Sequence, residues 1–353
     1  MSDPFSFFKE RFAYGRSVIG NIKDFSVFDL EARPKRVFLR EEAKELIEML
    51  ALYVLSKLSQ SVLVLGLRGT GKTSNVLVAA EAAKVEDGAT VFYVNLRTAN
   101  TYTKIYTAFT GRNGRGLSWS ELLDDIVEAC SQPPCIVVLD DLLYSLSRRS
   151  KAFTVVVTQD YHFEEKLSES VKSSLLPHIL FFREYQQREL YEILKLRAED
   201  GLAEWDDAAL RHLAALVARD FRGDARVAIR ALYYLGLNAK WGEGDIQRAL
   251  SLASKEIERD ALEKLLFKDL VVLFFVTKDE DTVEAYAHAE HFLRDHGLSM
   301  SKPTFFKTLS YLQGLGLIFL AKKKANRSYT YEVKHLLADP DVVSQILEKH
   351  LRT

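Results

Sequence analysis

The feature that most constrains this chain is a glycine-rich segment between an apolar stretch and a helical stretch. The apolar stretch, Ser61 to Leu65, is short and β-branched, which is typical of a buried strand. The helical stretch runs from Asn75 to Lys84. A strand, a glycine-rich loop and a helix in this order form a P-loop, in which backbone N–H groups converge on phosphate oxygens at a helix N-terminus. The sequence therefore predicts an α/β nucleotide-binding domain, with a parallel sheet flanked by helices.

The residues of this loop predict that ATP or ADP binds here together with Mg²⁺. Lys72 is expected to reach the β- and γ-phosphates, and Thr73 is expected to bind Mg²⁺ through its hydroxyl. The predicted nucleotide-binding residues of the loop are Gly66, Leu67, Arg68, Gly69, Thr70, Gly71, Lys72, Thr73 and Ser74.

Two further predicted strands end in polar residues that suit this chemistry. The strand from Cys135 to Leu139 is followed by Asp140, which is expected to hold Mg²⁺ through water, and by Asp141. Asp141 stands where a longer Glu commonly orients the attacking water, which predicts slow hydrolysis. Alternatively, both acids cap the next helix. The strand from Phe153 to Val157 is followed by Gln159, whose amide can sense the γ-phosphate.

The composition narrows the class of protein. A length of 353 residues suggests two or three domains at roughly 100–200 residues each. The longest apolar runs are much shorter than the ~20 residues of a membrane span, and the start of the chain lacks the pattern of a secretory signal. We therefore expect a cytoplasmic protein without a membrane partner. Cys130 and Cys135 form no recognisable metal or disulfide pattern and are expected to be inert core thiols.

Helical periodicity dominates the second half of the chain. Helices are predicted over 187–199, 206–218, 225–238 and 243–258, and a second group over 261–277, 282–296 and from Ser301 to Gly314. Residues 317–321 and 329–333 are predicted to form a hairpin joined by the basic loop 322–328. Three helices followed by a basic hairpin predict a winged helix. The domain boundaries expected are 1–184 for the nucleotide-binding core, 185–258 for a helical lid and 259–353 for the winged helix.

The order of these motifs resembles AAA+ ATPases, and more closely the archaeal and eukaryotic family of origin-recognition and replication-licensing initiators. The segment from Pro34 to Glu42 is similar to the one that this family places before the P-loop, and Ser170 to Leu175 is similar to its Arg-Val-x-Ser-Ser-Leu segment. Gly223-Asp224-Ala225-Arg226 is similar to its sensor-2 motif.

The resemblance implies roles for residues outside the loop. It places Val37 and Arg40 near the adenine, and it implies that Arg226 reaches the γ-phosphate, a contact to which a planar guanidinium is suited. The arginine expected around Ser170 is missing, and Lys172 is the nearest cation. Because an arginine supplied in trans can be worth roughly 10³–10⁵ in rate, its absence also predicts a slow ATPase switch.

The charge of the C-terminal end favours nucleic acid as a partner. The whole chain has a net charge of −1, whereas residues 301–353 carry nine Lys and Arg against four acids. In the third helix Phe305, Leu309 and Leu312 share a face spaced for burial. The residues expected to be more exposed are Lys302, Thr304, Lys307, Thr308 and Tyr311, and the helix is expected to enter the major groove. The predicted contacts to double-stranded DNA are Lys302, Thr304, Lys307, Lys322, Lys323, Lys324 and Arg327.

These features together favour a nucleoid-associated, ATP-dependent replication initiator that binds origin-type duplex DNA, with the replicative helicase and other initiator copies as further partners. Two alternatives stay open. One is an ATP-gated transcriptional regulator or protein-interaction scaffold, since winged helices also bind proteins. The other is a clamp-loader-like or transposition ATPase, which should form rings and hydrolyse ATP briskly.

Overall fold

A computed structural model gives the fold of the chain. It describes residues 9, 21–32, 36–95, 101–132, 134–140, 152–159, 178–279, 281–315, 317–325, 328–336 and 339–351. The chain divides into two compact units, one over Ile22–Ala225 and one over Met1–Asn21 with Arg226–Thr353. We call the first the sheet unit and the second the C-terminal unit.

The sheet unit is built on five parallel strands, β1 (Ser61–Gly66), β2 (Thr90–Asn95), β3 (Cys135–Asp140), β4 (Phe153–Thr158) and β5 (His178–Phe182). They lie in the order β2-β3-β4-β1-β5, and each pairing is parallel. β1 is inserted between β4 and β5, two strands that follow it much later in the chain. The loop after β1 therefore leaves the sheet where the strand order reverses, which is where open α/β sheets commonly bind ligands.

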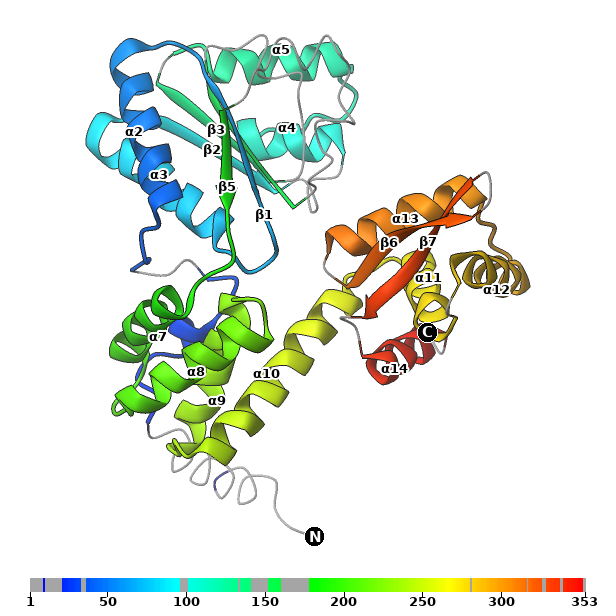
Figure 1. Ribbon diagram of the computed structural model, residues 1–353. Helices are drawn as coiled ribbons and strands as arrows, with labels where there is room; N and C mark the ends of the chain where they lie inside the picture. Colours follow the sequence, from blue (N-terminus) through cyan, green and yellow to red (C-terminus); the bar gives the residue numbers. More distant parts are fainter. Residues whose placement is uncertain are drawn as a thin grey trace. The chain divides into compact units, whose positions relative to one another are not determined.

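Helices cover both faces of this sheet (Figure 1). α2 (Glu41–Ser56) and α3 (Lys72–Asp87) lie on one face, and α4 (Tyr102–Thr110) and α5 (Trp119–Ala129) lie on the other. The first face buries alternate strand residues such as Val62 and Val64 against α2 and α3. The second buries Val137 and Leu139 against α4 and α5. Because the inner strands β1, β3 and β4 are buried on both faces, their sequences are mostly apolar, which made these strands recognisable.

A pair of helices completes the sheet unit, α7 (Gln187–Gly201) and α8 (Asp207–Asp220). The short 3₁₀ helix η1 (Phe25–Phe28) packs on the end of α7. Gly201 has no side chain, and a Cβ built on it would lie 2.7 Å from the Phe28 ring. The Lys23 N–H donates to the Gly201 carbonyl oxygen at 2.8 Å. The segment before α2 is therefore attached to α7 at this point.

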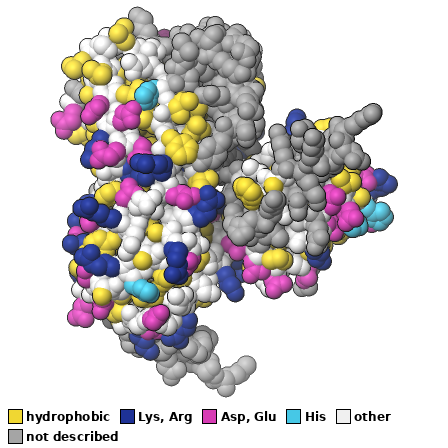
Figure 2. Space-filling model, viewed as in Figure 1, with side chains coloured by type: hydrophobic (Ala, Val, Ile, Leu, Met, Phe, Trp, Pro, Cys, Tyr) yellow, Lys and Arg dark blue, Asp and Glu magenta, His cyan; other side chains and the backbone are white. Residues whose placement is uncertain are grey.

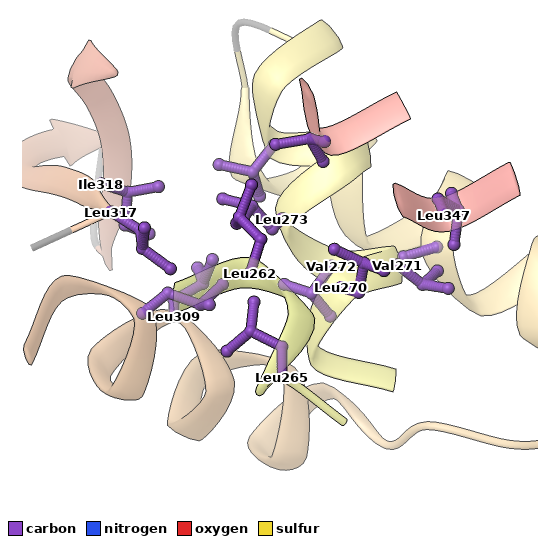
Figure 3. Close-up of a cluster of buried hydrophobic side chains, with 14 of the residues drawn as sticks. Leu262, Leu265, Leu270, Val271, Val272, Leu273, Leu309, Leu317, Ile318 and Leu347 are labelled. Atoms are coloured by element: carbon purple, nitrogen blue, oxygen red, sulfur yellow. The ribbon is translucent and has the colours of Figure 1, made fainter. Parts of the chain in front are cut away.

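The C-terminal unit contains α9 (Ala225–Asn238) from Arg226 onward and α10 (Glu243–Glu263), and it continues with a winged-helix arrangement. That arrangement comprises α11 (Phe267–Lys278), α12 (Thr282–Asp295), α13 (Lys302–Gly314), the antiparallel hairpin β6 (Ile318–Ala325) and β7 (Ser328–Leu336), and α14 (Pro340–Leu351). Figure 3 shows its core, where leucines and valines of α10 and α11 meet Leu309, Ile318 and Leu347. The fold predicted from the sequence, an AAA+ P-loop domain with a C-terminal winged helix, is confirmed.

Several details differ from the predictions. α10 continues to Glu263 where a new helix was expected from Ala261, and α11 begins only at Phe267. Lys322, Lys323 and Lys324 belong to β6, where they pair with Tyr331, Thr330 and Tyr329, instead of forming a loop. α14 was not predicted. Among the described residues, no helix combines the length and apolar character that crossing a bilayer requires.

The prediction for the two cysteines is wrong. Cys130 ends α5 and Cys135 begins β3, and the short connection brings their Cα atoms to 5.5 Å, where the two residues form a disulfide. This separation lies within the usual range for disulfide-bonded residues. A sequence separation of five gave no sign of the pairing, because it depends on how closely the helix end approaches the strand.

Candidate nucleotide-binding site

The loop after β1 has the backbone that phosphate binding requires. Gly69 and Gly71 have φ values of +79° and +75°, a region that suits glycine. Gly71 is also the N-cap of α3, so the amides of the first turn of this helix point toward the loop. Side chains at either glycine would collide with neighbours, since a Cβ would lie 2.0 Å from Asp224 Oδ1 at Gly69 and 2.1 Å from the Tyr185 hydroxyl at Gly71. Both the conformation and the close packing therefore require glycine.

Lys72 folds back over the loop. Its side chain is 6% exposed, and its ammonium donates to the carbonyl oxygens of Gly66 at 2.9 Å and Leu67 at 2.7 Å. The Thr70 hydroxyl also donates to the Leu67 carbonyl oxygen, at 2.9 Å. A lysine in this place lies next to the amides of the loop. It can exchange neutral acceptors for the more strongly accepting oxygens of a phosphate.

Arg40 is buried beneath the loop and contacts its backbone. Its side chain is 3% exposed and donates to the carbonyl oxygens of Thr70 at 3.3 Å and Arg183 at 2.7 Å. Its guanidinium pairs with Glu42 at 3.5 Å and with Glu189 of α7 at 3.4 Å. Arg40 thus joins the P-loop, the end of β5 and the start of α7. The adenine contacts expected for Arg40 and the half-buried Val37 stay predictions.

Tyr185 is a site residue that sequence reasoning missed. The Arg40 guanidinium stacks over its ring at 4.4 Å, and its hydroxyl hydrogen-bonds with the Asn75 side chain beside Gly71. Burial raises the pKa of Tyr185 to about 12, although the nearby Arg40 charge acts in the opposite direction. The phenol is therefore neutral at physiological pH. No sequence motif marks Tyr185, because its partners come from three separate segments.

The polar ends of β3 and β4 lie at the same edge as the P-loop. In the sheet register Asp140 pairs with Val157, and Leu65 pairs with Thr158, so Gln159 follows directly beside the start of the loop. Two buried oxygens near the loop, Gln159 Oε1 and Asn75 Oδ1, accept no hydrogen bond from the described residues. Unsatisfied buried acceptors are uncommon in folded proteins, and their presence at this edge is consistent with a polar ligand.

The structure leaves several predicted site residues untested. Thr73 lies in the first turn of α3, half-buried, and Ser74 follows it, exposed. The side chain of Asp140 and all of Asp141 are outside the described residues, as is the segment around Lys172. Arg226 is the first residue of the C-terminal unit, and its contact with a phosphate stays a prediction.

The candidate DNA-binding surface lies on α13. Lys302, Thr304 and Lys307 are exposed, whereas Phe305, Leu309 and Leu312 are fully buried, so the predicted division of this helix is confirmed for these residues. Thr308 is an exception, since it is buried and donates to Asp269 Oδ1 of α11 at 3.1 Å. The side chains of Lys322, Lys323 and Lys324, and Arg327 as a whole, are outside the described residues.

The chain resembles archaeal DNA replication proteins in sequence and in structure. It is 31% identical over 301 residues to ORC1-type DNA replication protein 3 of Sulfurisphaera tokodaii, an alignment that covers 75% of this chain and 77% of the relative. It is also 31% identical over 261 residues to ORC1-type DNA replication protein 1 of the same organism, where the alignment covers 64% of each chain. It thus matches slightly less than two thirds of the length of that relative. No protein-family model matches the chain.

The solved structures agree with this. The ORC1 protein of Aeropyrum pernix, solved in complex with DNA, superimposes with a TM-score of 0.70 at 27% identity, over 93% of this chain and 97% of that one. The CDC6 protein of Pyrobaculum aerophilum, at 20% identity and a TM-score of 0.56, shares the fold. Since the alignment with replication protein 3 reaches 31% identity over three quarters of both proteins, the chain belongs to the family of ORC1-type DNA replication proteins.

Proposed function

We propose that this protein is an ATP-dependent replication initiator that binds double-stranded DNA at origins and acts as a slow ATPase switch. The main support for this proposal is that one chain combines two features. A P-loop lies at the carboxyl edge of a parallel sheet, and the third helix of a winged helix exposes Lys302, Thr304 and Lys307. The names of its relatives and the A. pernix ORC1 structure with DNA support the same function.

The residues of the sheet unit suit the nucleotide part of this function. The amides that follow Gly69 bind the phosphates, and the Lys72 ammonium leaves the carbonyl oxygens of Gly66 and Leu67 to pair with them. Thr73 and Asp140 hold Mg²⁺, which neutralises phosphate charge when bound. Gln159 and Arg226 contact the γ-phosphate. Asp141 and the absence of an arginine between Ser170 and Leu175 limit the rate of hydrolysis.

The C-terminal unit supplies the DNA contacts in this proposal. α13 enters the major groove, and the basic residues of the hairpin, Lys322 to Lys324 and Arg327, bind phosphates of the backbone. A protein that acts at origins would be nucleoid-associated. It would work with further copies of itself and with the replicative helicase.

Binding of the full-length protein to labelled duplexes tests the proposal. Duplexes from an origin region and of random sequence are titrated with ATP and with ADP over a series of salt concentrations. Lys72→Ala serves as the variant that cannot bind nucleotide. We expect binding that weakens as the salt concentration rises and that is tighter for origin sequence than for random sequence. The affinity of the wild-type protein for DNA should differ between ATP and ADP, and this difference should be smaller for Lys72→Ala. The absence of duplex binding at low salt in every nucleotide state would refute the proposal.

Mapping of DNA occupancy in cells separates the initiator from the regulator. Enrichment at sites where replication starts supports the initiator. Enrichment at promoters alone would favour an ATP-gated transcriptional regulator. Brisk ATP hydrolysis by a ring assembly would instead favour a clamp-loader-like ATPase.

A further inference from the structure

One polar residue of α13 faces the inside of the winged helix. Among the described residues of this helix, Thr308 is the one polar side chain that is buried, at 7% exposed. Its hydroxyl donates to Asp269 Oδ1 of α11 at 3.1 Å. Thr308 directly follows the exposed Lys307 and lies one helical turn after the exposed Thr304. The hydrogen bond therefore starts from the same two turns of α13 as two residues that are proposed to meet DNA.

The acceptor of this hydrogen bond is partly withdrawn from water. Asp269 is half-buried in the first turn of α11, and burial raises the pKa of its carboxyl, while the hydrogen bond from Thr308 acts in the opposite direction. A hydrogen bond to a partly dehydrated carboxylate is stronger than one in water. The neighbouring Lys268 donates to the Ser299 carbonyl oxygen at 3.0 Å, two residues before the N-cap Ser301 of α13. The first turn of α11 therefore contacts α13 in its middle and the chain just before its start.

The apolar contacts of α13 and this hydrogen bond restrain the helix in different ways. Phe305, Leu309 and Leu312 are fully buried in the core of the winged helix, as Figure 3 shows for Leu309. Burial of apolar area is non-directional, so it holds the helix on the core more strongly than it fixes its rotation. A hydrogen bond, in contrast, weakens steeply as its angle departs from linear. The bond between Thr308 and Asp269 therefore resists rotation of α13 about its own axis.

The rotation of α13 matters more for reading bases than for binding phosphates. Contacts to base edges require side chains held to within about 0.5 Å and 10–20° of the correct geometry. Lys302 and Lys307 have long, flexible side chains, and the attraction of an ammonium to a phosphate depends little on angle. A loosened α13 would therefore keep its attraction to any duplex and lose part of its preference for one sequence.

We propose that Thr308 and Asp269 are positioning residues that fix the rotation of α13 and thereby set how well this protein discriminates between DNA sequences. This inference rests on the proposed binding of duplex DNA through α13. In this mechanism Thr308 does not touch the nucleic acid, because its hydroxyl is turned toward α11. The two residues act through Thr304 and the other exposed side chains of the helix.

The substitution Thr308→Val in the full-length protein tests this mechanism, because valine has the shape of threonine and cannot donate the hydrogen bond. Affinities for labelled duplexes of origin and of random sequence are measured with ATP over a series of salt concentrations, well below the melting temperature of each variant. We expect the ratio of the two affinities to fall by about three- to ten-fold, through weaker binding of the origin duplex. The affinity for the random duplex and its salt slope should equal those of the wild type. An unchanged ratio, or an equal loss for both duplexes, would overturn the inference.

Further variants separate positioning from stability. Thr308→Ser keeps the hydroxyl and Asp269→Asn keeps an acceptor oxygen, so both should retain the preference for origin sequence. If the Val variant does not fold, Asp269→Ala removes the same bond from the other side and should lower the ratio in the same way. The double variant Thr308→Val/Asp269→Ala should lose no more than the larger single loss, because both changes remove one bond. Additive losses, or a loss in Thr308→Ser as large as in Thr308→Val, would contradict the inference.

A matched control and the wild type separate this inference from the proposed function. Thr277→Val makes the same substitution in α11, where the Thr277 hydroxyl donates to the Phe274 carbonyl oxygen of its own helix at 2.7 Å. It should leave both affinities unchanged. If the wild type binds neither duplex, or binds both equally, the proposed function fails. If the wild type prefers the origin duplex and the Val and Ala variants retain that preference, only the inference fails.

Discussion

At the scale of single residues, the protonation of Tyr185 in the candidate site affects the free energy of unfolding. Its phenol is buried between Arg40 and the P-loop, and burial raises its pKa from 10.0 to about 12. The folded state therefore keeps the proton of Tyr185 over a pH range in which the unfolded chain has lost it. A group with a raised pKa in the folded state contributes stability that is complete below its unfolded pKa and is lost as the pH rises through its folded pKa.

This leads to a prediction about alkaline unfolding. Between pH 10 and about 12 the wild-type protein should lose stability relative to Tyr185→Phe, because the variant has no phenol to ionise when it unfolds. The measurement is the free energy of unfolding by denaturant at several pH values, in both proteins. A constant difference between them over this range would show that the Tyr185 hydroxyl is not shielded from solvent.

The residue scale also shows the limit of sequence reasoning at this site. The glycine pattern, Lys72 and the polar strand ends Asp140 and Gln159 could be predicted as candidates because each stands at a fixed distance from a recognisable strand or loop. Tyr185 and the contact between Asp224 and Gly69 could not. They depend on side chains that meet only after distant segments have folded together, and no local pattern records such a meeting.

At the scale of elements, the attachment of the N-terminal segment to α7 is held by close packing. Gly201 accommodates Phe28, which is 1% exposed, and Arg36 pairs with Glu199 and Asp200, the two residues directly before Gly201. The segment then continues to Arg40, which contacts the P-loop. The attachment therefore places one end of this segment on α7 and the other on the loop.

A side chain at Gly201 should break this attachment. Gly201→Val would force Phe28 out of its pocket, with a loss of stability of about 1–3 kcal/mol typical of overpacking. Thermal unfolding measures the effect. Gly244→Ala is a matched control, since it is also a helical glycine but has no heavy atom within 4 Å of an added Cβ, and it should be neutral or slightly stabilising. Equal melting temperatures for wild type and Gly201→Val would contradict the packing described.

The elements themselves were predictable where periodicity was strong. The strands β1, β3 and β4 are apolar and short, and α13 carries its N-cap Ser301 and an early proline. Lys322 to Lys324 were assigned to a loop because three lysines lack a strand pattern, yet they pair with Tyr331, Thr330 and Tyr329, which favour strands. The break between α10 and α11 carries no glycine or proline, so local sequence gave no sign of it.

At the scale of the whole molecule, charge is distributed unevenly along a nearly neutral chain. The net charge is −1, whereas residues 301–353 contain nine Lys and Arg and four acids, so the remainder is acidic overall. On the face shown in Figure 2, Lys and Arg side chains lie interspersed with Asp and Glu over the described residues of the sheet unit. On this face the mixture of charges would give little non-specific attraction to a duplex. The basic excess of residues 301–353 therefore predicts that salt-dependent affinity comes from this segment.

The salt dependence of DNA binding provides the corresponding test. If Lys322, Lys323 and Lys324 each neutralise one phosphate, replacing all three by glutamine should reduce the slope of log affinity against log salt by up to about 3. The control variant replaces three exposed arginines by glutamine and so removes the same charge. These are Arg211, Arg219 and Arg248, whose side chains are 60%, 72% and 76% exposed and which pair with aspartates on their own helices. That control should change the slope little. Equal slopes for both triple variants would mean that the hairpin does not contact the backbone, and that overall charge alone sets the affinity for DNA.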